Sequence, residues 1–315
     1  MSEFDFSPAL LQLARQAEEE IRGQFAEIEE ISARNTAKVL KAFSANRVSD
    51  ACFAGTVGYG YDDLGRDKLE LIYAQIFGAE KALVRHNFVN GTHALTAAMF
   101  ACVSSGDVFL SATGNVYDTL QTVTGQRGKT GGTFADYNIE FRQVPLAEGL
   151  PDLPAIEKAA ADPAVKAVFI QRSRGYARRQ TLSCRQIEEI CQAVRRVNPH
   201  AAILADNCYG EFVEETEPTQ HGADLIAGSL IKNPGGGLAP SGGYVAGRGD
   251  LVERAAYRLT APGIGGECGA SLGVNRSLYQ GLFLAPHVVS QAVKTAAFAA
   301  ALLERLGCQV SPRAG

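Results

Sequence analysis

A single lysine, Lys232, lies between an apolar run and a glycine-rich segment. The run Leu225 to Ile231 contains apolar and small residues, and after Lys232 the chain has Gly235, Gly236, Gly237, Gly242 and Gly243. We expect this lysine to be shielded from water, and desolvation lowers the pKa of an amine and makes it a usable nucleophile. Glycines also let a planar group approach the backbone closely. The alternative is an ordinary strand end followed by a surface loop.

An acidic residue, Asp206, ends another apolar run earlier in the chain. Residues 201–205 are predicted to form a short buried strand, and α/β sheets bind their ligands at the carboxyl ends of such strands. Pyridoxal phosphate needs a lysine to hold it covalently and an acid to keep its pyridine nitrogen protonated. Lys232 and Asp206 therefore predict a pyridoxal-phosphate site, in which Lys232 also acts as the base that takes the substrate Cα proton.

Four segments of the chain support this interpretation. They are GYGYDDLGRDKLE (58–70), QRSRGY (171–176), LADNCYGEF (204–212) and SLIKNPGGG (229–237). They resemble the methionine gamma-lyase family, including its aluminium-resistance proteins, which are relatives of the cystathionine lyases among the fold-type-I pyridoxal-phosphate enzymes. The resemblance implies a carbon-sulfur lyase that acts on a sulfur-containing amino acid by β- or γ-elimination.

A phosphate site is expected where Asn90, Gly91 and Thr92 precede a predicted helix at residues 94–103. The free N–H groups and the partial positive charge of a helix N-terminus bind phosphate. Asn90 could instead be an ordinary N-cap, and the residues alone leave both readings open. The resemblance places Asn90, Gly91 and Thr92 at the cofactor phosphate, and adds Ser229 as a hydroxyl ligand.

Aromatic and basic residues follow two further predicted strands. Tyr117 comes after the strand at 107–112, and the resemblance implies that it stacks on the pyridine ring; otherwise it is a core tyrosine. Arg172, Arg174 and Tyr176 come directly after the strand at 165–171. The arginines could bind a substrate carboxylate in bidentate fashion, although a basic run is more often a solvated face.

The loop Gly55 to Arg66 contains Tyr59 and Tyr61 beside four glycines. In the related lyases the equivalent loop supplies a tyrosine and an arginine to the cofactor phosphate of the other subunit. The resemblance therefore implies this role for Tyr59, Tyr61 and Arg66, and a homodimer or homotetramer with shared active sites. The alternative is a turn with surface aromatics.

The fold expected is α/β, because predicted strands alternate with predicted helices at 67–77, 94–103, 153–161 and 184–197. Such alternation favours a mostly parallel sheet with helices on both faces. Three parts are expected: an N-terminal helical arm (1–48), a large pyridoxal-phosphate-binding domain (49–290), and the start of an incomplete, truncated small C-terminal domain (291–315). In the related lyases that domain supplies an arginine for the substrate carboxylate, so the resemblance leaves the activity of a chain of this length open.

Composition restricts the class of protein. The chain has 315 residues, is 46% hydrophobic and has a net charge of −4, so a nucleic-acid partner is not expected. The apolar runs are too short to cross a membrane, and the start MSEFDF does not resemble a signal peptide. Seven cysteines without a C-x-x-C pair fit reduced thiols, so we expect a cytoplasmic protein. Five scattered histidines give no metal-ligand cluster.

Two other functions fit the same residues. An aminotransferase or an aldolase would use the same lysine and aspartate. A non-catalytic protein that sequesters a metal ion or a cofactor is a different possibility, because four acidic residues lie close together in the chain and could bind a hard cation. These residues are Glu211, Glu214, Glu215 and Glu217.

Overall fold

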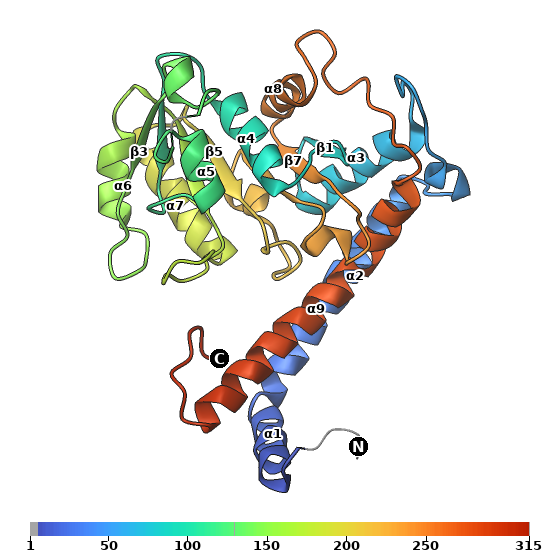
Figure 1. Cartoon of the computed structure of the whole chain (residues 1–315), viewed down its shortest axis with the longest axis vertical. Coiled ribbons are helices and arrows are strands. Elements are labelled where there is room, and N and C mark those ends of the chain that lie inside the picture. The colour runs from blue at the N-terminus through green and yellow to red at the C-terminus, as the bar shows by residue number, and fades with distance from the viewer. Residues whose placement is uncertain (1–5, 129, 315) are drawn as a thin grey trace.

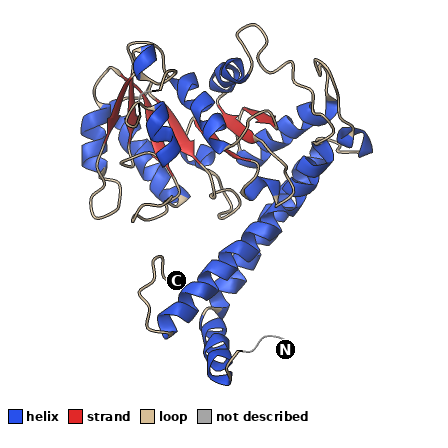
Figure 2. Cartoon of the chain, viewed as in Figure 1, coloured by secondary structure: helices blue, strands red, loops and turns tan. Residues whose placement is uncertain are grey.

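Seven strands form one sheet, with helices on both sides of it (Figure 1, Figure 2). The computed structural model describes residues 6–128 and 130–314. The strands are β1 (Lys81–Arg85), β2 (Val108–Ser111), β3 (Glu140–Gln143), β4 (Val165–Gln171), β5 (Ala202–Asp206), β6 (Leu225–Ser229) and β7 (Gly243–Gly247). Their order across the sheet is β1-β7-β6-β5-β4-β2-β3, and of these seven β7 alone runs opposite to the others. The predicted α/β class with a mostly parallel sheet is confirmed.

Helices pack on both faces of the sheet, with α7 (Cys184–Val197) on one face and α4 (Gly91–Cys102) on the other. The other helices of the described residues are α1 (Pro8–Glu20), α2 (Arg22–Ala45), α3 (Leu64–Phe77), α5 (Asp118–Val123), α6 (Leu153–Ala160), α8 (Gly249–Leu259) and α9 (Asn275–Arg305). Successive residues of a strand point to opposite faces, so the central strands are apolar throughout. In β5, Ile203 faces the core that contains Ile187 of α7, whereas Leu204 faces the core that contains Leu95 of α4.

The carboxyl ends of the central strands lie together because the strands are in parallel register. Gln171 at the end of β4 is paired with Asp206 at the end of β5, and Asp206 is paired with Ala227 of β6. The crossover helix α7 has Ser183 as its N-cap, and Ser183 forms a capping box with Gln186. The fold therefore places the residues that follow β4, β5 and β6 at one edge of the sheet.

The sequence did not predict β7 or the length of α9. The glycines that bound β7 are usual turn residues, yet Gly243 lies where an added Cβ would be 2.8 Å from the Ala94 Cβ, so the close packing of α4 on the sheet requires a residue without a side chain. Residues 275–305 form one helix of 31 residues, which runs through the expected domain boundary at residue 290.

A helical stalk formed by α1, α2 and α9 projects from the α/β body (Figure 1). Ala17 and Ile21 pack against Ala301 in a small apolar cluster, and Arg305 forms an ion pair with Glu20. The predicted arm is thus paired with the C-terminal helix of the same chain. The expected boundary at residue 290 lies inside α9, and the three-part division stays a prediction; residues 1–5 of the arm and residue 315 lie outside the described residues.

No helix within residues 6–128 and 130–314 combines the length and the apolar character that a membrane crossing requires.

Candidate active site

A cavity of about 370 Å³ lies at the carboxyl ends of β4, β5 and β6. Lys232 and Asp206 both line it, together with Gly91 and Thr92 at the start of α4 and Tyr117 before α5. Residues far apart in the sequence therefore meet in one cavity. The amine and the carboxylate needed at opposite ends of one cofactor ring face the same space.

Lys232 lies in the turn after β6 and is partly buried. Its Nζ is 4.3 Å from the centre of the Tyr209 ring. Burial by itself would lower the pKa of Lys232, but the neighbouring Cys208, Asp206 and Tyr209 favour the charged amine, and the pKa is raised. The expectation of a lowered pKa was wrong, because the sequence shows the apolar neighbours of a lysine but not the polar groups that folding brings to it.

Asp206 is the last residue of β5 and is almost fully buried. Its Oδ1 accepts a hydrogen bond from the backbone N–H of Cys208, at 3.0 Å. Burial raises the pKa of Asp206, while that hydrogen bond and the charge of Lys232 act in the opposite direction. A buried carboxylate of this kind is stabilised by a further positive partner, and a protonated pyridine nitrogen is one.

The start of α4 and the end of β6 form a cradle suited to a phosphate. The Oγ of Ser229 is buried and has no hydrogen-bond partner among the described residues. A Cβ added to Gly91 would lie 3.1 Å from the Ser229 Cβ and 3.4 Å from the Cys208 Sγ, so only glycine leaves this space open. An unpaired buried hydroxyl is costly, and a phosphate oxygen would satisfy it. The residues present therefore fit the phosphate of pyridoxal phosphate.

Asn90 and Thr92 differ in their relation to this cradle. The Oδ1 of Asn90 accepts a hydrogen bond from the His93 N–H at 3.0 Å, so Asn90 is the N-cap of α4, as one of the two sequence readings had it. Thr92 lines the cavity, and its hydroxyl is 2.8 Å from that of Thr119. A direct phosphate contact by either residue stays a prediction.

Tyr117 and Tyr176 line the same cavity as Lys232. Their ring centres are 5.8 Å apart and the rings are tilted by 31°. Tyr117 immediately precedes α5 and is partly buried, whereas Tyr176 is 88% exposed. The structure thus places Tyr117 at the site, and its stacking role stays a prediction.

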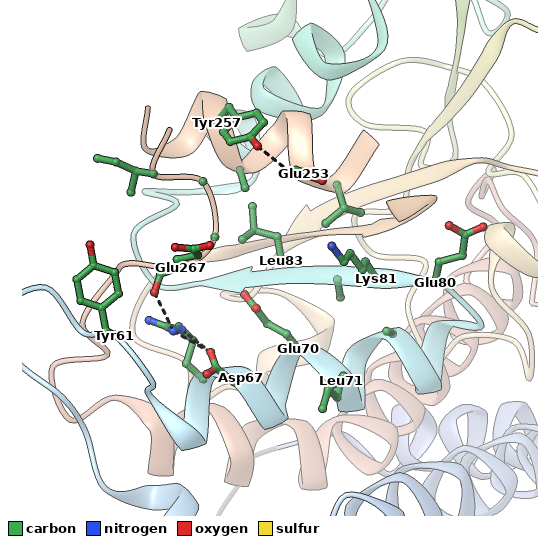
Figure 3. Close-up of a pocket in the computed structure, with 18 of the residues that line it drawn as sticks. Tyr61, Asp67, Glu70, Leu71, Glu80, Lys81, Leu83, Glu253, Tyr257 and Glu267 are labelled. Atoms are coloured by element: carbon green, nitrogen blue, oxygen red, sulfur yellow. Dashed lines mark hydrogen bonds and ion pairs between the residues drawn. The ribbon is translucent and has the colours of Figure 1, made fainter. Parts of the chain in front are cut away.

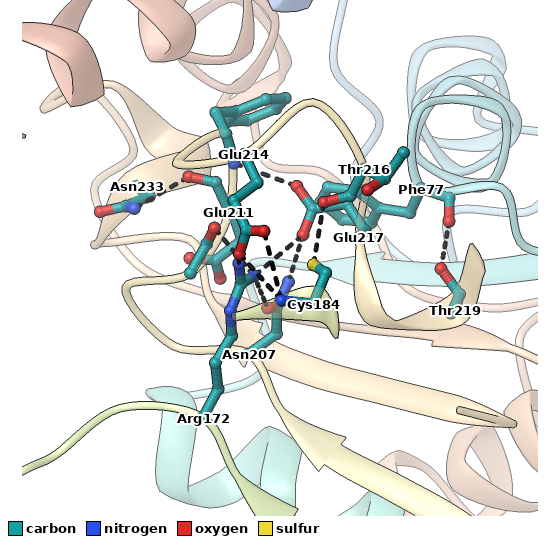
Figure 4. A network of polar contacts seen from close by, with 12 residues as sticks. Phe77, Arg172, Cys184, Asn207, Glu211, Glu214, Thr216, Glu217, Thr219 and Asn233 are labelled. Atoms are coloured by element: carbon teal, nitrogen blue, oxygen red, sulfur yellow. Dashed lines mark hydrogen bonds and ion pairs between the residues drawn. The ribbon is translucent and has the colours of Figure 1, made fainter. Parts of the chain in front are cut away.

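Arg172 lines the cavity wall but is 98% buried, and its guanidinium is already bonded within the chain (Figure 4). Nη1 donates to the Asn207 Oδ1 at 2.7 Å and to the Gly210 carbonyl at 3.0 Å, and Nη2 donates to the Glu214 Oε1 at 2.6 Å. Glu217 lies 3.5 Å from Nη1. This bonding differs from the expectation that Arg172 offers its guanidinium to a substrate, because the group instead fixes the loop that follows β5.

Two other arginines of this segment, Arg174 and Arg179, also bond to the backbone. The Nη1 of Arg174 donates to the Ser311 carbonyl at 2.6 Å, and Arg174 lines the cavity. Arg179 is buried and donates to the carbonyls of Thr113 and Ser173. These bonds hold residues 172–182 against the neighbouring loops, and substrate binding by Arg174 and Tyr176 stays a prediction.

The loop with Tyr59, Tyr61 and Arg66 does not line the cavity that contains Lys232. Tyr61 and Arg66 line a second cavity of about 690 Å³ beside α3, β1 and α8 (Figure 3). Arg66 is buried and donates to the Gly269 carbonyl at 2.9 Å and to the Asp67 Oδ1 at 2.9 Å. Tyr59 is 79% exposed. Any contact of this loop with a partner's cofactor stays a prediction, and Arg66 would have to leave its present bonds to make one.

The four acidic residues considered for a metal ion are bonded to other partners. Glu214 pairs with Arg172, and Glu215 pairs with Arg34. Glu217 accepts a hydrogen bond from the side chain of Asn207 (Figure 4). Glu211 accepts one from the Tyr244 hydroxyl at 2.8 Å. Within the part of the chain that the structure describes, no group of three or more His, Cys, Asp and Glu side chains is arranged to hold a metal ion.

Cys208 and Tyr209, which lie next to Lys232, are among the cavity-lining residues that sequence reasoning missed. Burial raises the pKa of the Cys208 thiol well above its ordinary value, so the thiol is neutral. Both residues directly follow Asp206 and Asn207. Their place in the loop after a ligand-bearing strand is the signal that could have identified them.

A family model and several known proteins are similar to this chain. The family described as methionine gamma-lyase matches residues 10–315. YnbB, an uncharacterized protein of Bacillus subtilis, is 48% identical over 306 residues, which are 96% of this chain and 72% of that protein. A structure described as a carbon-sulfur lyase involved in aluminum resistance from Clostridium novyi has a TM-score of 0.95 at 46% identity, over 98% of this chain and 74% of that one.

The fold extends to a more distant relative. The pyridoxal-5'-phosphate dependent protein YhfS from Escherichia coli is 19% identical and has a TM-score of 0.65, over 88% of this chain and 70% of that one. The architecture is therefore that of the fold-type-I pyridoxal-phosphate enzymes. Since the family match extends over nearly the whole chain, the protein belongs to the methionine gamma-lyase family.

Proposed function

We propose that this protein is a pyridoxal-phosphate-dependent carbon-sulfur lyase that acts on a sulfur-containing amino acid by β- or γ-elimination. The main support is the single cavity that Lys232 and Asp206 share, together with the unpaired hydroxyl of Ser229, which lies at the end of β6 beside Gly91 at the start of α4. Membership of the methionine gamma-lyase family and the description of the Clostridium novyi relative support the reaction class.

The cofactor would be held at three points. The free N–H groups at the start of α4 and the Ser229 hydroxyl bind its phosphate. The Asp206 carboxylate would accept a hydrogen bond from its pyridine N–H, and Lys232 would hold its aldehyde carbon until the amine of the substrate replaces Lys232 there. When bound, pyridoxal phosphate supplies an electron sink that stabilises negative charge on the Cα of an amino acid.

The protein's own groups provide the proton transfer and the positioning. Once the substrate amine has replaced it, Lys232 is released as a neutral amine, and its Nζ would take the Cα proton of the substrate as a base beside the cavity wall. Tyr117 restricts the tilt of the bound ring from one side. Because Ser229 would hold the cofactor phosphate and Asp206 would hold the pyridine nitrogen, the substrate Cα would be kept within reach of Nζ.

The experiment is an absorption titration of the purified protein with pyridoxal phosphate, followed by product analysis with cystathionine, methionine and cysteine. We expect an absorption band in the wild type that is lost in Lys232→Ala, and release of ammonia, a 2-oxo acid and a thiol. Amino transfer without thiol release would favour the aminotransferase alternative. A wild-type protein that takes up no pyridoxal phosphate would refute the proposal.

We also propose a homodimer or homotetramer with shared sites, which rests on the exposed Tyr59 and Tyr61 rings and on the family resemblance. Analytical ultracentrifugation tests it, and a monomer at the concentration of the activity assay contradicts it.

A further inference from the structure

Tyr209 covers the amine of Lys232. The Nζ lies 4.3 Å from the centre of the aromatic ring, within the range of a cation–π contact. The ring is 61% exposed and lines the cavity. Its position is therefore not explained by burial of its own apolar surface, because most of that surface stays in water.

The backbone of Tyr209 is strained. Its φ of 67° lies in the left-handed region, which is unfavourable for a bulky L-residue and is usual for glycine. Such a conformation persists only where the surrounding structure imposes it, and strained residues of this kind concentrate at functional sites. Phe212, three residues later, also has a left-handed φ of 63° and is buried in the core.

The buried network beneath the loop imposes this conformation. Arg172 donates to the side chain of Asn207 and to the carbonyl of Gly210, so it binds the loop on both sides of Tyr209. Asn207 also donates to Glu217 at 2.8 Å, and the Gly210 N–H donates to the Asn207 carbonyl at 2.8 Å. A Cβ on Gly210 would lie 2.5 Å from the Cδ of Arg172, so the loop is packed directly on the guanidinium stem.

We propose that Tyr209 is a positioning residue for Lys232: its ring holds the protonated amine over the cavity, and the Arg172 network keeps the ring in place. An aromatic face stabilises the charged amine, so the neutral amine becomes a stronger base. The proposal rests on the proposed lyase function only in that the Lys232 amine acts there as the base. The contact itself exists in the cofactor-free protein, where it can be tested separately.

The test is competitive labelling of Lys232 with an amine-specific acylating reagent in the cofactor-free protein, across the alkaline pH range, with peptide mass spectrometry as the readout. Tyr209→Leu removes the aromatic face and Tyr209→Phe keeps it. We expect Leu to raise the labelling rate about two- to five-fold at pH values below the midpoint of the profile, because more of the amine is neutral. We expect Phe to behave as the wild type.

Tyr176→Leu is the matched control, since it removes another exposed ring of the same cavity, one that packs on Tyr117. It should leave the pH midpoint of Lys232 labelling unchanged. The proposal is overturned if Tyr209→Leu keeps the wild-type pH midpoint of labelling, or if Tyr209→Phe shifts the midpoint as Tyr209→Leu does. It is also overturned if only the labelling rate at the high-pH plateau changes, because that would mean that the ring merely shields the amine from the reagent. The absorption titration with pyridoxal phosphate is independent, so failure of the lyase function is distinguished from failure of this contact.

Discussion

Ser229→Ala should change the stability of the cofactor-free protein and the affinity for pyridoxal phosphate in opposite directions. The Ser229 side chain is fully buried, and its Oγ has no partner among the described residues. A buried unsatisfied polar group costs about 1–3 kcal/mol, and alanine removes it without creating a cavity larger than one oxygen atom. We therefore expect the free energy of unfolding of the cofactor-free protein to rise by ~1 kcal/mol, and its melting temperature by ~2 °C.

The same substitution removes a donor to the phosphate. A hydrogen bond to a charged group contributes about 1.5–3 kcal/mol, which corresponds to a loss of affinity of about ten- to one-hundred-fold. The stability is measured by calorimetry on the cofactor-free protein, and the affinity by absorption titration with pyridoxal phosphate. A rise in stability together with a loss of affinity distinguishes a hydroxyl that binds the ligand from one that only packs in the core.

Ser290→Ala is a suitable control, because Ser290 is also buried but donates to the His287 carbonyl at 2.7 Å within α9. It should lower stability slightly and leave the cofactor affinity unchanged. Wild-type affinity in Ser229→Ala would show that the phosphate is not bound at this cradle. A loss of stability in the cofactor-free variant would show that the hydroxyl already has a partner.

Three further substitutions test the loop that follows β5 and the buried groups beneath it. Burial raises the pKa of Glu211 from 4.5 to about 8, so between these pH values the folded state holds a proton that the unfolded chain releases, and the free energy of unfolding should fall as the pH rises. Glu211→Gln should reduce this slope, measured by urea unfolding, by up to ~1.4 kcal/mol per pH unit. An unchanged slope contradicts the prediction. Tyr209→Gly relieves the left-handed strain and should leave thermal stability equal or raise it by up to ~1 kcal/mol, whereas a clear loss would show that the ring stabilises the fold. Arg172→Met leaves Glu217 buried without its cation and should lower the free energy of unfolding by ~3–5 kcal/mol in denaturant titration; a change below ~1 kcal/mol would mean that the pair is not coupled.

The central strands were predictable because local patterns specify them. The apolar run at 165–171 is β4 to the residue, and the predicted helix at 184–197 is α7 to the residue, because a serine cap and an amphipathic face mark it. β7 was not predictable, since its glycines are turn signals in isolation and become strand residues only under the close packing of α4. The unbroken length of α9 was also missed, because its pairing with α2 is a contact between distant parts of the chain.

The sequence by itself determined the types of the reacting groups, Lys232 and Asp206, and their place after two buried strands. Both can be read from the sequence because side-chain chemistry and the short-range periodicity of apolar residues are properties of a local segment. Only the tertiary structure decided which groups surround them: Tyr209 over the amine, the unpaired Ser229 hydroxyl beside Gly91, and an Arg172 that is bonded inside the protein. Burial and charge at a site depend on neighbours that are distant in sequence, so the direction of the Lys232 pKa shift could be read only after folding had placed them.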